Sequence, residues 1–149
     1  IVEKGITNIS VYDASSTHVS YLISEAFKFS HIFICSPTYN RNMFPPIHEF
    51  LDHMRLLNLQ NRKIAIVENG SWAVRSGDLI QEFIEKNMDD MEIINERITI
   101  ASTMSPDKGY ELDSMAQAIV DSLNATDISL PEGVPQLPVD NIQFARERR

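Results

Sequence analysis

Cysteine is nearly absent from this 149-residue sequence, in which Cys35 is the only one. One cysteine cannot form an intramolecular disulfide or supply a cysteine cluster for zinc or an iron–sulfur centre. A reducing compartment, the cytoplasm, therefore fits best. Basic residues are also few, with 13 Lys and Arg against 21 Asp and Glu and a formal net charge of −8. This balance disfavours non-specific binding to nucleic acid or to anionic lipid.

Long apolar runs are missing as well. The longest ones, such as residues 32–35 and 64–67, are far shorter than the roughly 20 residues that span a bilayer. No membrane span is therefore expected. The length suits one domain with a single core. The first Met is Met43, so we expect that Ile1 is not a translation start and that the chain is a piece of a longer protein.

Strand patterns and amphipathic helices alternate along the chain. Residues 7–12 alternate between apolar and polar side chains, which predicts a half-buried edge strand. Residues 31–35 and 63–67 are almost continuously apolar, as in strands covered on both faces, so the first of them is expected in the middle of the sheet. Another strand is predicted over residues 93–101. Apolar residues at helical spacing predict four helices, which begin near residues 19, 47, 76 and 112.

This alternation predicts an α/β domain with a parallel sheet, because parallel strands need crossover connections of a dozen or more residues. The domain covers residues 1–124. From residue 125 onward, prolines and charged residues indicate a C-terminal linker or tail, 125–149. The hydroxyl cluster at residues 15–17 is interpreted as a helix cap. Cys35 is interpreted as a small apolar filler of a buried strand.

Three loops, residues 36–44, 69–75 and 102–108, each follow a predicted strand and precede a predicted helix. Ligands of open parallel sheets bind outside the carboxyl ends of the strands, so we expect these loops at one rim. The first two loops offer hydroxyls, amides, a glycine and two aromatic rings, Tyr39 and Trp72, that can cover a flat ligand. The pattern predicts a site for a planar heteroaromatic molecule.

The residues of these two loops also resemble those of a known family. The similarity is to the flavodoxin-like domain of the A-type flavoproteins, also called flavodiiron proteins. It rests on Ser36-Pro37-Thr38-Tyr39-Asn40 with Phe44-Pro45-Pro46, preceded by Val11-Tyr12-Asp13 and Thr17-His18-Val19-Ser20-Tyr21. The second loop, Asn69-Gly70-Ser71-Trp72, is similar to the family's loop beside the flavin ring, in a looser order. The resemblance implies a flavodoxin-like three-layer sandwich that binds FMN and relays electrons to a non-haem diiron site.

The resemblance assigns cofactor-binding residues and partners. The loop flanking the isoalloxazine ring is implied to be Ser36, Pro37, Thr38, Tyr39, Asn40 and Asn42, and the opposite loop Asn69, Gly70, Ser71, Trp72 and Ala73. The protein would orient FMN and tune its redox potential, without a catalytic side chain or metal ligands of its own. The implied partners are a diiron β-lactamase-like domain, in the same polypeptide or a neighbouring subunit, and a rubredoxin-like or reductase donor. A homodimer is compatible with the family.

The sequence departs from the family pattern near its start. A flavodoxin-like fold has strand order 2-1-3-4-5, and the loop after its first strand holds the FMN phosphate. If residues 7–12 are strand two, strand one and the phosphate loop are absent, and we expect about 25–30 further residues upstream, as a βα half-unit requires. Two alternatives stay open: a stand-alone flavodoxin-like NAD(P)H:quinone reductase, and a truncated domain that no longer binds FMN tightly. A receiver-like interaction module is disfavoured, because no acceptor Asp follows residues 31–35.

Overall fold

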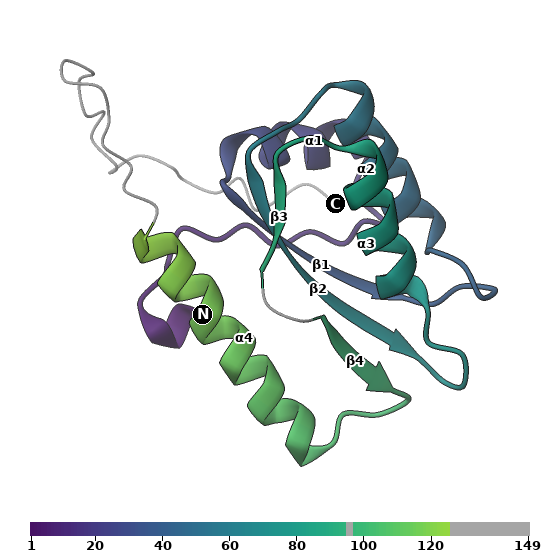
Figure 1. Cartoon of the computed structure of the whole chain (residues 1–149), viewed down its shortest axis with the longest axis vertical. Coiled ribbons are helices and arrows are strands. Elements are labelled where there is room, and N and C mark those ends of the chain that lie inside the picture. Colours follow the sequence, from purple (N-terminus) through teal and green to yellow (C-terminus); the bar gives the residue numbers. More distant parts are fainter. Residues whose placement is uncertain (95–96, 126–149) are drawn as a thin grey trace, which may run out of the picture.

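A computed structural model describes residues 1–94 and 97–125 of the chain. Figure 1 shows its elements, which in chain order are η1 (Val2–Lys4), α1 (Val19–Lys28), β1 (His31–Pro37), α2 (Pro45–Leu56), β2 (Arg62–Gly70), α3 (Ser76–Asn87), β3 (Met91–Ile93), β4 (Ile98–Ala101) and α4 (Pro106–Ala125). Residue 125 ends α4, and the rest of the predicted linker lies outside the described residues. None of the described helices has the length and apolar content of a membrane-spanning segment.

The sheet is parallel throughout, and β2 is its central strand (Figure 1). On one side β2 pairs with β1 over the seven residues of that strand. On the other side β2 pairs with β3 near its start and with β4 near its end. The α/β class and the parallel sheet that the sequence predicts are confirmed.

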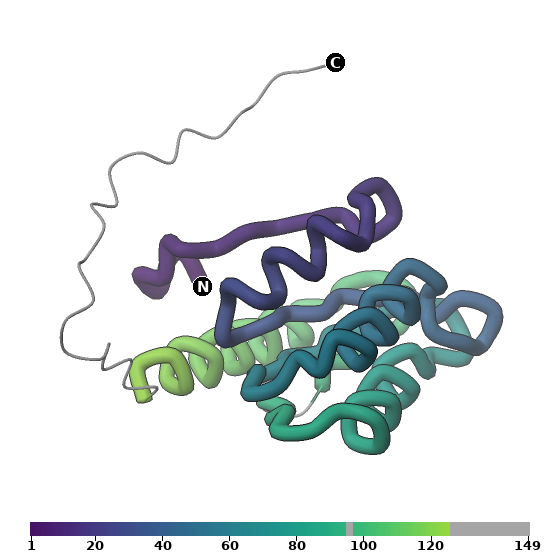
Figure 2. Tube along the Cα trace, turned by 90° about the horizontal axis from the view of Figure 1, so that it is seen from above, coloured from purple at the N-terminus to yellow at the C-terminus, as the bar shows by residue number. Residues whose placement is uncertain are grey.

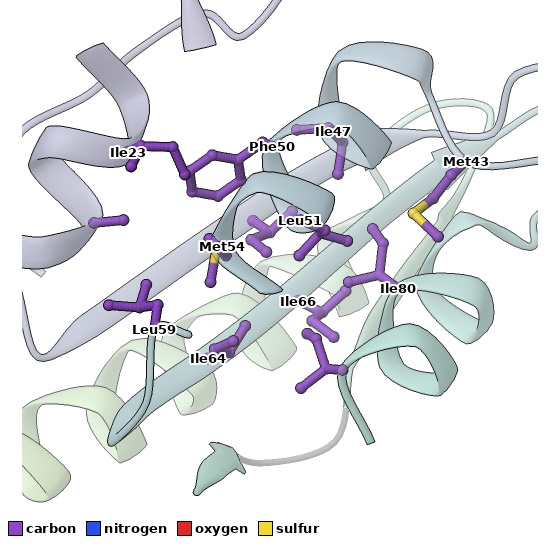
Figure 3. Close-up of a cluster of buried hydrophobic side chains, with 13 residues drawn as sticks. Ile23, Met43, Ile47, Phe50, Leu51, Met54, Leu59, Ile64, Ile66 and Ile80 are labelled. Atoms are coloured by element: carbon purple, nitrogen blue, oxygen red, sulfur yellow. The ribbon is translucent and has the colours of Figure 1, made fainter. Parts of the chain in front are cut away.

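Alternate side chains of β2 serve two apolar cores on opposite faces of the sheet. Ile64 and Ile66 are fully buried beneath α1, α2 and α3 (Figure 3). Ala65 and Val67 face the other way, toward α4. Because both faces of β2 are covered, residues 64–67 in its middle form an uninterrupted apolar run, which is why the strand could be predicted from the sequence. The result is a three-layer arrangement of helices, sheet and helix.

The last part of the sheet consists of two short strands, where the sequence predicts a single strand over residues 93–101. β3 pairs with residues 62–64 of β2, and β4 pairs with residues 67–70. The N–H of Ile94 still donates to the C=O of Ile64 at 2.8 Å, so the ladder of β3 continues one residue beyond the strand. β3 and β4 therefore occupy the same side of β2 in succession, and the prediction of one continuous strand is wrong.

Residues 7–12 do not form the predicted edge strand. They have no strand partner among the described residues, and Val11, on the side expected to be buried, is 88% exposed. The segment runs as an extended stretch beside α1 (Figure 2). The pKa of Glu25 on α1 is lowered mainly by Lys28, with smaller contributions from the side chains of Tyr12 and Ser10. The alternating pattern is therefore present without the neighbouring strand that would bury its apolar side.

β1 lies at the edge of the described sheet, where the sequence predicts it in the middle. Its outer edge pairs with nothing within residues 1–94 and 97–125. Ile34 is buried against the helices of one face, whereas Phe33 and Cys35 on the other face are exposed, because α4 packs on β2 and β4. The prediction that Cys35 is buried is thus wrong, although the protein atoms close to the thiol still raise its pKa by desolvation.

The cap of α1 is His18, in place of the predicted hydroxyl cluster. The Nδ1 atom of His18 accepts the N–H of Ser20 at 3.3 Å. The predicted cap residue Ser15 belongs to an earlier turn, in which its N–H and its hydroxyl both donate to the Asp13 carboxylate, at 2.8 and 2.7 Å. Asp side chains often organise such turns. The hydrogen bonds from Ser15 lower the pKa of Asp13.

Candidate functional site

The loops that follow β1 and β2 enclose a cleft at the carboxyl edge of the sheet. Its volume is about 460 Å³, within the range of about 300–1,000 Å³ that is typical of small-molecule sites. The lining residues are Thr38, Asn40 and Arg41 from the first loop and Gly70, Ser71, Trp72 and Ala73 from the second. The structure therefore brings the two loops together at the place where parallel sheets bind ligands.

A tight turn shapes the first loop. Tyr39 and Asn42 face each other as an isolated bridge, and the N–H of each donates to the C=O of the other, at 3.0 and 2.8 Å. Asn40 and Arg41 between them have φ angles of 49° and 60°, as the two central residues of a type I′ turn require. Both central residues line the cleft. The side-chain oxygen of Asn42 instead accepts the N–H of Met43 at 2.8 Å.

Thr38 ties the two loops together. Its N–H donates to the C=O of Asn69 at 2.7 Å. Its hydroxyl oxygen accepts the N–H groups of Arg75 and Ser76, at 2.9 and 3.1 Å. The first N–H groups of a helix have no partner within the helix, and Arg75 at the N-cap makes no side-chain capping bond. Thr38 therefore caps α3 from another loop. The Ser76 hydroxyl adds a second link by donating to the C=O of Ser36 at 3.1 Å.

Replacing Thr38 with valine keeps the shape of the side chain and removes the cap. We expect the free energy of unfolding to fall by about 1–2 kcal/mol, the usual cost of losing a hydroxyl cap. Urea denaturation followed by circular dichroism measures the change. Thr7→Val is a matched control, because Thr7 is exposed and lies outside the cleft. Equal unfolding midpoints for the two variants would contradict the capping role.

The end of β2 connects the second loop to the third. The side-chain amide of Asn69 donates to the C=O groups of Ile100 and Ser102, at 3.0 and 3.3 Å. The C=O of Gly70 accepts the N–H of Ser102 at 2.8 Å. A Cβ on Gly70 would lie only 3.2 Å from Cγ2 of Val74, so glycine permits the close turn of the chain at this point. Asn69 therefore holds the loops in place without lining the cleft itself.

A buried carboxylate beneath the second loop escaped the sequence analysis. The Glu68 side chain is 2% exposed, and its Oε2 accepts the N–H of Gly77 in the first turn of α3 at 2.7 Å. Its Oε1 accepts the hydroxyl of Thr99 at 2.7 Å and Nε of Arg97 at 3.2 Å. Arg97 also forms an ion pair with Asp78 of α3. This cluster holds the end of β2 against β4 and against the start of α3. The second loop connects β2 to α3, so the cluster fixes both of its ends.

The sequence did contain a signal for the buried carboxylate. Glu68 is two residues after Ile66 and four after Ile64, so alternation along the strand places it on the same buried face. A carboxylate at such a position needs hydrogen-bond partners. A Cβ on Gly77 would lie 2.8 Å from Cδ of Glu68, so the glycine at the start of α3 makes room for this contact.

The residues that the resemblance assigns to the site separate into two groups. Those that line the cleft are Thr38, Asn40, Gly70, Ser71, Trp72 and Ala73. Those that do not line it are Ser36, Pro37, Tyr39, Asn42 and Asn69. Arg41 also lines the cleft, although the resemblance assigns only its two neighbours, Asn40 and Asn42, to the site.

The two aromatic rings of the loops differ in their surroundings. Trp72 is 92% exposed and lies on the wall of the cleft. Tyr39 is also exposed, but its ring packs edge-on against Phe44 with a centroid separation of 6.4 Å. Trp72 is therefore the ring available to cover a ligand in the cleft, whereas Tyr39 contacts Phe44 and does not line the cleft.

Comparison with known proteins gives one sequence relative and several structural ones. No family model matches the sequence. An uncharacterised protein of Methanocaldococcus jannaschii is 25% identical over 100 residues, which cover 67% of this chain and 25% of that protein. The chain therefore spans only a quarter of the length of this relative.

The similar solved structures have flavodoxin-like domains. A rubredoxin oxygen:oxidoreductase from Desulfovibrio gigas aligns with a TM-score of 0.74 and 22% identity, over 83% of this chain and 30% of that one. The Flv1 flavodiiron core from Synechocystis sp. PCC6803 aligns with a TM-score of 0.73 and 12% identity, over 84% and 30%. An archaeal flavodoxin aligns with a TM-score of 0.65 and 18% identity, over 83% and 82%. These similarities establish a flavodoxin-like fold, as the sequence predicts.

Proposed function

We propose that the cleft binds the ring system of FMN and that this chain is an FMN-dependent electron-transfer unit. The observation that carries the proposal is the convergence of the loops after β1 and β2 on one cleft, with Trp72 on its wall. This cleft lies at the carboxyl edge of a flavodoxin-like parallel sheet, where such sheets bind their ligands. The structures similar to this chain include a flavodiiron core and a flavodoxin.

The lining residues fit a flat heteroaromatic ring. Trp72 is exposed enough to stack on one face of such a ring. Gly70 and Ala73 leave the backbone accessible, because their side chains are small. The side chains of Asn40 and Ser71 provide donors and acceptors for the carbonyl and N–H groups at the edge of a flavin. FMN, when bound, supplies the redox chemistry, and the protein supplies binding, orientation and electrostatics.

The same cleft does not fit the FMN phosphate. A phosphate is usually held at a helix N-terminus or by several basic donors. The N–H groups at the start of α3 already donate to Thr38 and Glu68, and Arg41 is the only basic residue among those that line the cleft. We therefore propose that the ring occupies the cleft and that the phosphate lies beyond it.

We further propose that residues 1–124 form most of a flavodoxin-like domain whose sheet is completed by one more parallel strand. Support comes from the outer edge of β1, which is unpaired within the described residues, and from Phe33, a large side chain of β1 that is 46% exposed. In the strand order 2-1-3-4-5, the added strand would pair with β1, and its loop would hold the phosphate.

We also propose an acceptor and a donor for the electrons. We place a diiron site on a separate β-lactamase-like domain, in the same polypeptide or in a neighbouring subunit, and the electron donor among rubredoxin-like proteins or reductases. Support comes from the similarity to a rubredoxin oxygen:oxidoreductase and to a flavodiiron core, of each of which this chain covers 30%. A cytoplasmic location is part of the same proposal, since the single cysteine suits a reducing compartment.

Titration with FMN tests the proposal directly. Trp72 is the only tryptophan of the chain, so its fluorescence reports on the cleft itself. We expect added FMN to quench Trp72 emission, and bound FMN to show quenched fluorescence and a red-shifted absorption band, with one dissociation constant for both signals. A free-flavin spectrum at high protein concentration would refute the proposal. Turnover of a quinone with NAD(P)H alone would favour the stand-alone reductase instead.

A further inference from the structure

Arg41 occupies a backbone conformation that its residue type disfavours. Its φ is 60°, in the left-handed region. The second central position of a type I′ turn is most often glycine, because a Cβ is crowded there. The other non-glycine residues with positive φ in the described chain are all short and polar: Asn40, Asn58, Asn61, Asp90 and Ser102. Strained backbone conformations often occur at functional sites, so the strain at this position indicates a function for the Arg41 side chain.

The side chain of Arg41 also places an isolated positive charge on the cleft. It is the only charged residue among those that line the cleft, in a chain of net charge −8. No acidic residue of the described chain lies within ion-pair distance of its guanidinium, whereas Arg97 is neutralised by Glu68 and Asp78. The charge of Arg41 is therefore available to a ligand.

We infer that Arg41 sets the redox potential of the flavin by stabilising the negative charge of the reduced ring. This inference rests on the proposed function, because it requires the ring to occupy the cleft. Reduction adds two electrons from a donor, and with one proton taken from solvent the ring keeps one negative charge. A nearby cation that is not paired with an acid lowers the energy of that form relative to the neutral oxidised ring. Arg41 thereby raises the midpoint potential.

Because the turn is strained at Arg41, a glycine variant can remove the charge without lowering the stability of the protein. Arg41→Gly removes the charge and at the same time relieves the left-handed backbone. We expect a melting temperature of the apoprotein at or above that of the unmodified chain, together with a more negative midpoint potential for bound FMN, measured by spectroelectrochemical titration with dithionite as reductant. Each tenfold loss of preference for the reduced over the oxidised flavin lowers the potential by about 30 mV. Arg41→Gln is expected to lower the potential without the gain in melting temperature, and Arg41→Lys is expected to keep most of the potential.

Asp90→Gly is the matched control. Asp90 is also charged and has a φ of 52°, but it precedes β3, which pairs with the amino end of β2, opposite the cleft. We expect this variant to raise the melting temperature and to leave the midpoint potential unchanged. If Arg41→Gly and Asp90→Gly have the same potential, the inference fails. If the unmodified chain holds no FMN in the titration described above, the proposed function fails first.

An experiment with riboflavin tests whether Arg41 acts on the flavin ring or on the phosphate. Riboflavin carries the same ring without the phosphate, so we expect Arg41→Gly to lower its potential by the same amount as that of FMN. A shift that appears with FMN and disappears with riboflavin would show that Arg41 acts on the phosphate, and would overturn the inference. A loss of affinity for the oxidised and the reduced forms alike, with no shift in potential, would overturn it as well.

Discussion

Replacing Glu68 with alanine is expected to lower the free energy of unfolding by about 3 kcal/mol, at the lower end of the range for removing one partner of a buried ion pair. The substitution leaves the N–H of Gly77, the hydroxyl of Thr99 and the guanidinium of Arg97 without their shared acceptor. The cost stays at the lower end because Arg97 keeps Asp78 and its side chain is 32% exposed. Thermal and urea denaturation measure the change.

Two further variants separate burial from charge. Glu82→Ala on α3 is the matched control, since Glu82 forms an ion pair with Lys86 at the surface, where solvent screens the two charges and leaves little net stabilisation. Glu68→Gln keeps one acceptor oxygen but loses the charge, so we expect an intermediate stability. If the unfolding free energies of Glu68→Ala and Glu82→Ala fall by the same amount, the cluster does not stabilise the fold.

The elements that could be predicted from the sequence are those whose own pattern of apolar residues shows which side chains are buried. β2 is covered on both faces, so its apolar run at residues 64–67 identifies the strand. The four helices each bury one face, and helical spacing reveals that face without knowledge of any partner. The loop positions followed in turn, because strand and helix alternate and the carboxyl ends of parallel strands share one edge of the sheet.

The elements that the sequence analysis placed wrongly depend on distant partners. An apolar run predicts coverage of β1 on both faces, yet the described residues leave Phe33 and Cys35 exposed and one edge unpaired. The alternation in residues 7–12 predicts a strand, but a strand requires a neighbour to bond to. Periodicity indicates which side chains favour burial. It does not indicate whether another segment of the protein packs against those side chains.

Within the site, the sequence located the loops better than their side chains. Type I′ geometry at Asn40 and Arg41 decides which residues of the first loop line the cleft. The sequence of the loop does not predict a type I′ turn, because the second central position of such a turn is usually glycine and here it is Arg41. The sequence therefore predicts Tyr39 on the cleft and does not indicate Arg41, whereas Arg41 lines the cleft and Tyr39 does not. The role of Glu68 was overlooked for a different reason, since its partners Arg97 and Thr99 are about 30 residues away.

Replacing Trp72 with alanine is expected to weaken FMN binding by about 10- to 100-fold, the effect of losing one aromatic ring stacked on a heteroaromatic base, about 1–3 kcal/mol. The side chain lines the cleft but is 92% exposed without a ligand. Its burial is therefore gained only on binding, and its removal should change the free energy of unfolding by less than about 0.5 kcal/mol. Quenching of FMN fluorescence measures the affinity, because the variant lacks tryptophan.

The choice of variants distinguishes stacking from general disturbance of the surface. Trp72→Phe keeps an aromatic face and is expected to lose less affinity than Trp72→Ala. Tyr21→Ala removes another exposed ring, from α1, outside the cleft, and should bind FMN as the unmodified chain does. A dissociation constant for Trp72→Ala equal to that of Tyr21→Ala would remove Trp72 from the site. A fall in unfolding free energy would instead show that the indole packs against the protein, so its role in binding would have to be measured at matched stability.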